Sequence, residues 1–391
     1  MKKKKITYVE LFSGIGAFSQ AILQLDFIEH ECVFAADINE KCADVYFTNY
    51  NINSLCDLTK QNESEIPKHN FCFFSPPCQA FSKSGKQKGF DDTRGTLIYE
   101  VFRILKKHKP KYILMENVRN LVSHDNGHTI KVINDKLKQL GYRIPEKPII
   151  LSPHYFGVPQ TRERAFLPGI YDPNNVDIPL DFKFDKFISK DCCTMDDIID
   201  HTFDNDESLK ITSKEEIVLN AWDEFYKNID IKVIGFPVWV DYFKRKYDVS
   251  MPQWKKDFIK KNNDLYERNK SFIDGWLKKY NIFNNFTPTQ RKFEWQAGEK
   301  IGTIWDGIIQ FRPSGIRVKA PTTLPALVAI VQIPIIGKLR RRLSVRECGN
   351  LQSFSQNFIF DKTRYEAYKQ LGNSINVTVL KEMLIKLLKY E

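Results

Sequence analysis

The sequence predicts an α/β fold in which a large domain, built on a mostly parallel sheet, is joined to a second, smaller domain. Three observations indicate this. Short apolar runs alternate with amphipathic stretches up to residue 170, a glycine turn follows the first apolar run, and the composition changes after Pro173. A chain of 391 residues is long enough for one large and one small domain.

Residues 6–12 are predicted to be the first strand and residues 17–25 the first helix, with the turn Ser13-Gly14-Ile15-Gly16 between them. A strand, a glycine turn and a helix in this order begin many nucleotide-binding folds, because glycine lets the backbone approach a ligand closely. Ser19 stands where a dinucleotide fingerprint has its third glycine, which disfavours NAD and leaves other adenosine-bearing cofactors open. A plain tight turn explains the two glycines equally well.

Residues 32–37 are predicted to be the second strand, and this strand ends in an acid. Asp37 follows Gly16 by 21 residues, a spacing that suits hydrogen bonds to ribose hydroxyls. The alternative is that Asp37 caps the helix predicted over 39–50. Asp57 follows another short apolar stretch, where it either caps a turn or binds an adenine amine.

Residues 71–74 (FCFF) are predicted to be a short buried strand, which Pro76 and Pro77 end directly before Cys78. This position places the thiol at the carboxyl edge of the sheet, where open α/β folds bind their ligands. Residues 79–96 are rich in Gly, Ser and Lys, and they are predicted to form a long functional loop. Considered alone, Cys78 fits a buried structural cysteine better than a catalytic one.

Residues 96–107 carry apolar side chains at helical spacing, and residues 112–115 are predicted to be a strand that leads into Glu116. A strand, helix and strand in succession imply parallel strands joined by a right-handed crossover. If the two strands are neighbours, Cys78 and Glu116 lie on one edge of the sheet, and together they form a catalytic constellation. The alternative for Glu116 is an exposed loop acid.

Two arginines, Arg162 and Arg164, alternate in the stretch QTRER before the apolar run 165–170. Alternation along a strand would put both guanidinium groups on one face. If the two guanidinium groups face a phosphate or a base oxygen, they are functional. If they face water, they belong to a solvated edge of the strand.

The region after Pro173 differs from the rest of the chain. Residues 181–210 carry nine acids and four lysines, a net charge of −5, and residues 241–300 carry fourteen basic and eight acidic residues, a net charge of +6. All six tryptophans lie between Trp222 and Trp305. A separate charge pattern with its own aromatic residues predicts a second domain. The apolar stripe of residues 380–388 needs a core to cover it, which predicts that the chain returns to its first domain.

Charge and cysteine usage restrict the partners and the compartment. The net charge of +11 and the pI near 9.0 indicate a polyanionic partner. The eight cysteines form no C-x-x-C pair, which disfavours a metal site and indicates reduced thiols in the cytoplasm. We expect no membrane association, because no apolar run reaches membrane-spanning length.

Taken together, these blocks resemble the DNA (cytosine-5)-methyltransferase family of the bacterial restriction–modification type. The resemblance spans residues 8–170 and about 340–391, and the blocks that carry it are LFSGIGAFSQA, SPPCQAFSKSGKQKGFDDTRGTL, MENVRNL, QTRERAF, RRLSVRECGNLQSF and QLGNSINVTVL. Ser13, where a small Ala is common, and Leu371 are minor departures. The middle region matches no assigned target sequence.

The resemblance implies a Rossmann-like, S-adenosylmethionine-dependent catalytic domain over residues 1–180, completed by 365–391. It also implies a target-recognition domain with a hinge over 181–364, and DNA in the cleft between the two domains. The positions that match cofactor-contacting motifs are Phe12, Gly14, Gly16, Asp37, Ile38, Asp57, Leu58, Pro77, Leu97, Asn373 and Ser374.

The chemistry of cytosine methylation assigns roles to the catalytic candidates. Carbon 5 of cytosine becomes nucleophilic once the Cys78 thiolate has added to carbon 6. Glu116 would bind ring nitrogen 3 while sharing a proton, and Arg162 and Arg164 would bind the base oxygen or a phosphate and keep Cys78 ionised. The base that removes the carbon 5 proton is not identified.

The expected partner is double-stranded DNA, with the target cytosine flipped out of the stack. The loop 79–96 would close over that base and bring Ser84 and Lys86 near the DNA. Arg312 and Arg317 are the candidates for base contacts, although contacts to phosphate explain them at least as well. We expect a monomer, and a cognate restriction endonuclease that acts separately.

Three other functions compete with this prediction. A tRNA cytosine methyltransferase shares the fold, but the large middle region argues against it. A nucleotide-dependent oxidoreductase is disfavoured by Ser19 and by the Pro-Pro-Cys edge. A non-catalytic DNA-binding relative is disfavoured because Cys78, Glu116, Arg162 and Arg164 are all present.

Overall fold

The computed structural model describes residues 3–77, 97–184, 194–231, 234–248, 250–330 and 332–390. The chain forms two compact units, residues 1–193 with 348–391 and residues 194–347. These boundaries differ from the predicted ones at 180 and 365. Residues 348–364 belong to the first unit because they bond to it: the Asn49 amide exchanges two hydrogen bonds with the backbone of Ile359, and Val377 N donates to Gln352 O over 3.0 Å.

The first unit begins with alternating strands and helices, as predicted. Its helices and strands in chain order are β1 (Lys4–Leu11), α1 (Ala17–Ile22), β2 (Ile28–Ala36), α2 (Glu40–Tyr50), β3 (Phe71–Phe74), α3 (Leu97–His108), β4 (Tyr112–Val118), α4 (His128–Gln139), β5 (Tyr142–Arg143), β6 (Ile149–Leu151), β7 (Gln160–Thr161), β8 (Arg164–Tyr171), α11 (Arg364–Asn373) and α12 (Val377–Leu388). The helix α10 (Val345–Leu351) crosses the boundary between the units.

The main sheet of this unit has the strand order β2-β1-β3-β4-β8-β5, and β6 pairs with β8. The strands β1 to β4 are parallel, as predicted, whereas β8 is antiparallel to its three partners. Because β2 and β3 lie on opposite sides of β1, the strand order reverses between β1 and β3. In open α/β sheets the carboxyl edge at such a point is where ligands bind.

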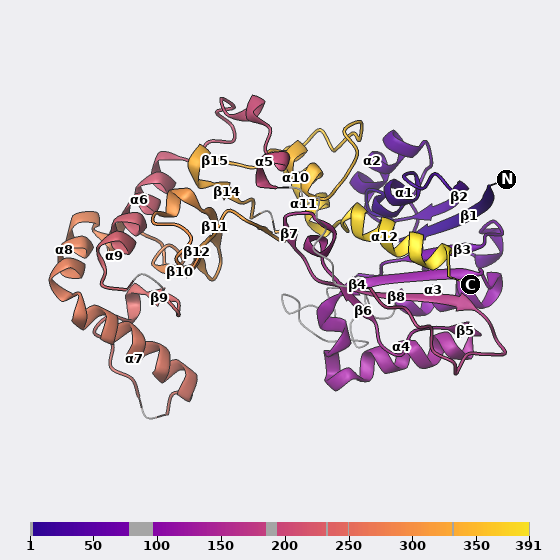
Figure 1. Ribbon diagram of the computed structural model, residues 1–391, viewed down its shortest axis with the longest axis horizontal. Coiled ribbons are helices and arrows are strands. Elements are labelled where there is room, and N and C mark those ends of the chain that lie inside the picture. The colour runs from indigo at the N-terminus through magenta and orange to yellow at the C-terminus, as the bar shows by residue number, and fades with distance from the viewer. Residues whose placement is uncertain are drawn as a thin grey trace. The chain divides into compact units, whose positions relative to one another are not determined.

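Apolar periodicity explains which faces are buried. All four residues of β3 are buried, since helices or loops cover both sides of a central parallel strand. The helix α3 buries one stripe, formed by Ile98, Val101, Phe102, Ile104 and Leu105. Helix α12 packs against α1 (Figure 1), which confirms that the chain returns to its first unit. None of the described helices is long and apolar enough to cross a membrane.

A buried acid, Glu10, anchors the start of the fold. It lies near the end of β1 and accepts hydrogen bonds from Ser19 Oγ at 2.5 Å and Tyr46 Oη at 2.9 Å. Tyr8 Oη lies 3.0 Å from the same serine hydroxyl. Burial raises the pKa of Glu10 to about 7, although these hydrogen bonds favour the ionised form.

Glu10→Gln should therefore flatten the pH dependence of stability. The pKa of Glu10 is ordinarily 4.5 and is about 7 in the folded chain. Between these pH values the folded chain therefore binds more protons than the unfolded chain. Wild-type stability consequently falls as pH rises through this window. The wild-type free energy of unfolding should fall by about 3 kcal/mol by pH 8. Urea unfolding at pH 5 and pH 8 measures it. Glu29→Gln, an exposed change on β2, should keep the wild-type slope, and an unchanged slope in Glu10→Gln would contradict the assignment.

The second unit is built on its own sheet, with the strand order β15-β14-β11-β12-β10-β9. Its helices and strands are α5 (Met195–Ile198), α6 (Ser213–Asn228), β9 (Val238–Trp239), α7 (Gln253–Arg268), α8 (Lys270–Tyr280), α9 (Ile282–Asn285), β10 (Lys292–Gln296), β11 (Ile308–Arg312), β12 (Gly315–Lys319), β13 (Leu324–Pro325), β14 (Ile335–Ile336) and β15 (Arg341–Arg342).

Aromatic side chains fill the core of this unit. Trp222 on α6 stacks on Phe293 of β10 with 4.8 Å between ring centroids, and Trp276 of α8 packs beside it. At another place in the unit Arg341, which is fully buried, forms two hydrogen bonds of 2.8 and 2.9 Å with the equally buried Glu347. Because these two buried charges compensate each other, Arg341 has a structural role.

Candidate active site

The register of β3 and β4 brings two polar side chains together at the carboxyl edge of the sheet. Phe74 pairs with Met115, so the next residues along the parallel strands, Ser75 and Glu116, are neighbours. Ser75 Oγ donates a 2.7 Å hydrogen bond to Glu116 Oε2. The predicted strand ends at Met115, but β4 continues to Val118, because its last residues pair with the antiparallel β8. Glu116 is therefore a buried strand residue and not a loop acid.

Arg164, the first residue of β8, compensates the charge of Glu116. Its Nε lies 3.1 Å from Oε1 of the carboxylate, and its side chain is 21% exposed. Oε1 is buried, yet it accepts no well-aligned hydrogen bond from the residues that the structure describes. A buried carboxylate oxygen in this state is costly in free energy unless a donor reaches it. The arrangement therefore presents one oxygen of Glu116 to a ligand that carries an N–H group.

Asn117 fixes the backbone that leads to Cys78. Its Nδ2 donates to Pro76 O over 3.1 Å, and its Oδ1 accepts from Val118 N at 2.9 Å. Sequence reasoning missed both Asn117 and Ser75. The parallel arrangement of the two strands was the signal for Ser75, because equivalent positions on parallel neighbours share one face of the sheet.

Arg162 does not share the position of Arg164. It precedes β8 and is 4% exposed, and its guanidinium donates to the carbonyl oxygens of Gly372 and Ser374, both at 2.9 Å. The prediction of two guanidinium groups on one strand face is wrong in this respect, because only Arg164 lies in the strand. Arg162 connects the polypeptide before β8 to the C-terminal end of α11.

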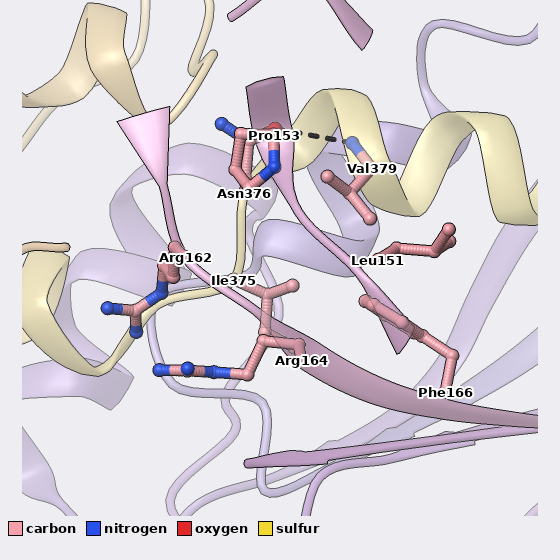
Figure 2. Close-up of a pocket in the computed structure, with 8 residues that line it drawn as sticks. All are labelled: Leu151, Pro153, Arg162, Arg164, Phe166, Ile375, Asn376 and Val379. Atoms are coloured by element: carbon pink, nitrogen blue, oxygen red, sulfur yellow. Dashed lines mark hydrogen bonds between the residues drawn. The ribbon is translucent and has the colours of Figure 1, made fainter. Parts of the chain in front are cut away.

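Figure 2 shows the packing beneath the two arginines. Leu151, Phe166 and Val379 lie on one side, and both guanidinium groups extend to the other. The cavity that these residues line has a volume of about 10 Å³, at the lower limit for one water molecule. It is a packing gap and has no room for a nucleobase.

The glycine turn is tied to the second strand by Asp37. Its Oδ2 accepts from Gly14 N and its Oδ1 from Asn39 N, both at 2.8 Å. Burial raises the pKa of Asp37, and these two backbone hydrogen bonds oppose that rise. The cap of α2 is Asn39, whose side chain accepts from Cys42 N. Asp37 is therefore not the helix cap.

The space around the turn fits a ribose-bearing cofactor. Gly14 has φ +53°, and no atom of the described residues lies within 4 Å of the place where a Cβ would stand. Gly16 has φ +85°, and a Cβ there would overlap the ring of Tyr50. The second glycine is thus required by packing, while the first leaves open space beside the carboxylate of Asp37, which has lone pairs left to accept hydroxyl groups.

The remaining cofactor candidates differ in how far they are exposed. Ile38 is 74% exposed and Asn373 is exposed, whereas Phe12, Pro77 and Leu97 are half-buried and Ser374 is 9% exposed. Leu58 is 4% exposed and packs in the core of the first unit, so its side chain offers little surface to a ligand. Asp57 accepts from Thr59 N and Thr59 Oγ1, so it does cap a turn, as one of the two alternatives predicted.

The two arginines proposed to read bases lie in the second unit. Arg317 on β12 pairs in register with Glu294 on β10 and with Gln310 on β11. Glu294 forms ion pairs with both Arg312 and Arg317. Burial, and then the charge of Arg312, lower the pKa of Arg317. A single carboxylate thus faces two partly desolvated guanidinium groups.

Cys78, Ser84 and Lys86 lie outside the described residues. Within the described ranges, no cluster of three His, Cys, Asp or Glu residues could hold a metal ion.

The chain resembles known proteins over its full length. Residues 6–389 match the family "C-5 cytosine-specific DNA methylase". Type II methyltransferase M.AluI of Cellulosimicrobium cellulans is 30% identical, with 97% of this chain and 91% of the relative covered. Type II methyltransferase M.BanI of Aneurinibacillus aneurinilyticus is 29% identical, with 97% and 95% covered.

Solved structures show the same fold. Methyltransferase EhMeth of Entamoeba histolytica superposes with a TM-score of 0.60 at 19% identity, covering 99% of this chain and 98% of that one. A mutant of Spodoptera frugiperda DNMT2 superposes with a TM-score of 0.55 at 21% identity, covering 98% and 100%. The fold is the predicted Rossmann-like methyltransferase fold with a smaller second unit. Because the family match spans nearly the whole chain, the protein belongs to the C-5 cytosine-specific DNA methylases and is a DNA (cytosine-5)-methyltransferase.

Proposed function

We propose that this methyltransferase moves a methyl group from S-adenosylmethionine to carbon 5 of a flipped-out cytosine in a specific duplex sequence, through a covalent adduct with Cys78. The observation that carries the proposal is the burial and the hydrogen bonding of the Glu116 carboxylate. Its carboxylate is buried at the edge where Ser75, Pro76 and Pro77 lead to Cys78, and its Oε1 lacks an aligned donor among the described residues. Cytosine has N–H donors on the edge that would face this oxygen.

Each step of the reaction can be assigned to residues of this chain. The Cys78 sulfur forms a bond to carbon 6, and the electron pair of the 5,6 double bond moves to carbon 5. Glu116 shares a proton with ring nitrogen 3, which offsets the negative charge that develops on the ring. S-Adenosylmethionine supplies an electrophilic methyl group. Loss of the carbon 5 proton to a base then restores the double bond as the thiolate leaves.

The two arginines have different roles in this scheme. Arg164 lies beside Glu116 Oε1 and would bind the base oxygen next to ring nitrogen 3. Arg162 is a positioning residue, because its hydrogen bonds to Gly372 O and Ser374 O hold the cofactor-side segment 372–374 against β8. Only Arg164 would contact the base.

The decisive experiment compares nucleic acid substrates. Purified enzyme with radiolabelled S-adenosylmethionine should label duplex DNA and leave tRNA unlabelled, and bisulfite sequencing of the DNA should show methylcytosine within one recurring sequence. Label on tRNA alone would favour the tRNA methyltransferase on the same fold. Methylation at cytosines in every sequence context would contradict the specificity part of the proposal.

Asp37→Ala should weaken S-adenosylmethionine binding. The variant loses the carboxylate that both accepts from Gly14 N and faces the open space at the turn, so we expect a loss of about 1–3 kcal/mol, as for a charged acceptor. Isothermal titration calorimetry measures it. Asp44→Ala on α2, an exposed acid, is the control. Equal affinity in both variants would mean that Asp37 only braces the turn.

We further propose that the second unit reads the DNA sequence. The catalytic edge contacts only the flipped base and the cofactor, so the flanking bases must be read in a groove by other residues. Arg312, Arg317 and Lys319 project from one face of the sheet and have Glu294 as a nearby carboxylate. The Nε atoms of both arginines are buried without an aligned acceptor among the described residues. This face is therefore suited to an anionic ligand with hydrogen-bond acceptors.

Arg317→Ala should relax the sequence preference. Bidentate arginine contacts to guanine contribute about 1–3 kcal/mol of discrimination, so methylation should spread to sites that differ at one position. Deep bisulfite sequencing of a random-sequence library measures the change, and Arg312→Ala serves as the second variant. Arg268→Ala, which removes an exposed arginine of α7, should leave the preference unchanged. An unaltered site in both variants would restrict these arginines to phosphate contacts or ion pairing.

The names of the relatives suggest the biological setting. Two relatives covered almost end to end are Type II methyltransferases. We propose that this chain is the modification enzyme of a restriction–modification system, acting as a monomer and separately from its endonuclease. Cleavage of unmethylated host DNA by a neighbouring gene product, and protection of that DNA after treatment with this enzyme, would support the assignment.

A further inference from the structure

We infer that Ser75 is a positioning residue which holds Glu116 so that only Oε1 faces the target base. The inference rests on the proposed role of Glu116 and adds a residue that the catalytic scheme does not contain. It starts from the 2.7 Å hydrogen bond between Ser75 Oγ and Glu116 Oε2. Because Oε2 accepts from Ser75 and Oε1 lies beside Arg164, the carboxylate is held in one orientation about its last side-chain torsion.

The hydroxyl of Ser75 is not needed to hold its own segment. Ser75 N donates to Leu11 O at the end of β1 over 3.3 Å. Pro76 O accepts from Asn117 Nδ2, and Pro76 and Pro77 restrict the backbone further. Since backbone groups already fix residues 75–77, the side chain of Ser75 is free to act on Glu116.

A hydroxyl suits this position because Glu116 must gain and lose a proton. While Glu116 is ionised, Ser75 donates to Oε2, as the structure shows. When the carboxyl carries the shared proton on Oε1, Oε2 remains an acceptor for Ser75, and if the proton moves to Oε2 the hydroxyl can accept instead, because it is both donor and acceptor. A lysine or arginine here would hold only the ionised form, and alanine would hold neither. Ser75 therefore keeps the orientation of Glu116 constant through a proton-transfer cycle.

The test begins with single-turnover methylation by Ser75→Ala. The methyl-transfer rate should fall roughly ten- to hundredfold, as expected for a lost hydrogen bond to a charged group, while DNA affinity stays within about twofold. Ser75→Thr keeps the hydroxyl and should restore most of the rate. Ser123→Ala, which removes an exposed hydroxyl from the same unit, should match wild type. Rates equal to wild type in Ser75→Ala would overturn the inference.

A double-mutant cycle shows whether Ser75 acts through Glu116. In the Glu116→Gln background, Ser75→Ala should change the single-turnover rate less than threefold. The carboxyl that Ser75 orients is absent there, and the amide of glutamine cannot transfer a proton in its place. The same fold loss in both backgrounds would refute the inference. The proposed function fails separately, if Glu116→Gln alone transfers methyl groups at the wild-type rate.

Discussion

Cys78→Ala should leave no measurable methyl transfer, while the fold and S-adenosylmethionine binding stay near wild type. Without the thiolate nothing adds to carbon 6, and carbon 5 of cytosine alone is too weak a nucleophile to attack a sulfonium methyl group. Single-turnover assays with excess enzyme measure the rate, and circular dichroism with calorimetry checks the fold and the cofactor. Substantial methylation by the variant would exclude the covalent mechanism.

A chemical trap identifies the nucleophile directly. DNA with 5-fluorocytosine at the target site should form a stable adduct, because fluorine cannot leave as the carbon 5 proton does, and peptide mapping should place the DNA on Cys78. Cys32→Ala is the matched control, since burial raises the pKa of that thiol to about 12 and keeps it un-ionised near neutral pH. An adduct on a cysteine other than Cys78 would reassign the nucleophile.

Glu116→Gln should lower the single-turnover rate by about 10²- to 10⁴-fold, the usual range for a lost general acid or base. The amide has nearly the shape of the carboxylic acid and can still contact Ser75 and Arg164, so DNA binding should change little. Rapid-quench methylation and fluorescence anisotropy measure the rate and the affinity separately.

Glu163→Gln is the control for this change. Glu163 is also an acid near β8, but its carboxylate forms an ion pair with the exposed Arg119 and has no contact with Ser75 in the described structure. Its variant should keep nearly full activity. If both variants retain wild-type rates, Glu116 has only a structural role and its burial must be explained by packing alone.

The sequence alone was sufficient for the central part of the sheet. The buried run 71–74, the strand at 112 and the amphipathic helix between them are short-range patterns, and a helical crossover between two neighbouring strands of one sheet makes those strands parallel. From this it followed that Glu116 lies at the same edge as the residues that lead to Cys78. The carboxyl end of β1 with its glycine turn was likewise readable, because turn chemistry is local.

The different roles of Arg162 and Arg164 were not readable from the sequence. In the sequence the two arginines are only two positions apart and look equivalent. Their partners distinguish them: Arg162 donates to the carbonyls of Gly372 and Ser374, whereas Arg164 pairs with the carboxylate of Glu116. The same holds for Leu58, which motif position assigns to the cofactor and the fold buries in its core. The partners of the two arginines lie more than 40 residues distant along the chain, and Leu58 is buried by the packing of its unit's core.

The sequence by itself thus determined the family, the α/β class, the edge that carries the chemistry and the residue types present there. Tertiary structure decided which oxygen of Glu116 has no aligned donor in the described part of the chain, that Ser75 occupies the other one, and that residues 348–364 belong to the first unit. The physical reason is the range of the interactions. Periodicity and turn propensity act over a few residues, whereas hydrogen-bond partners and burial are fixed only when distant segments meet.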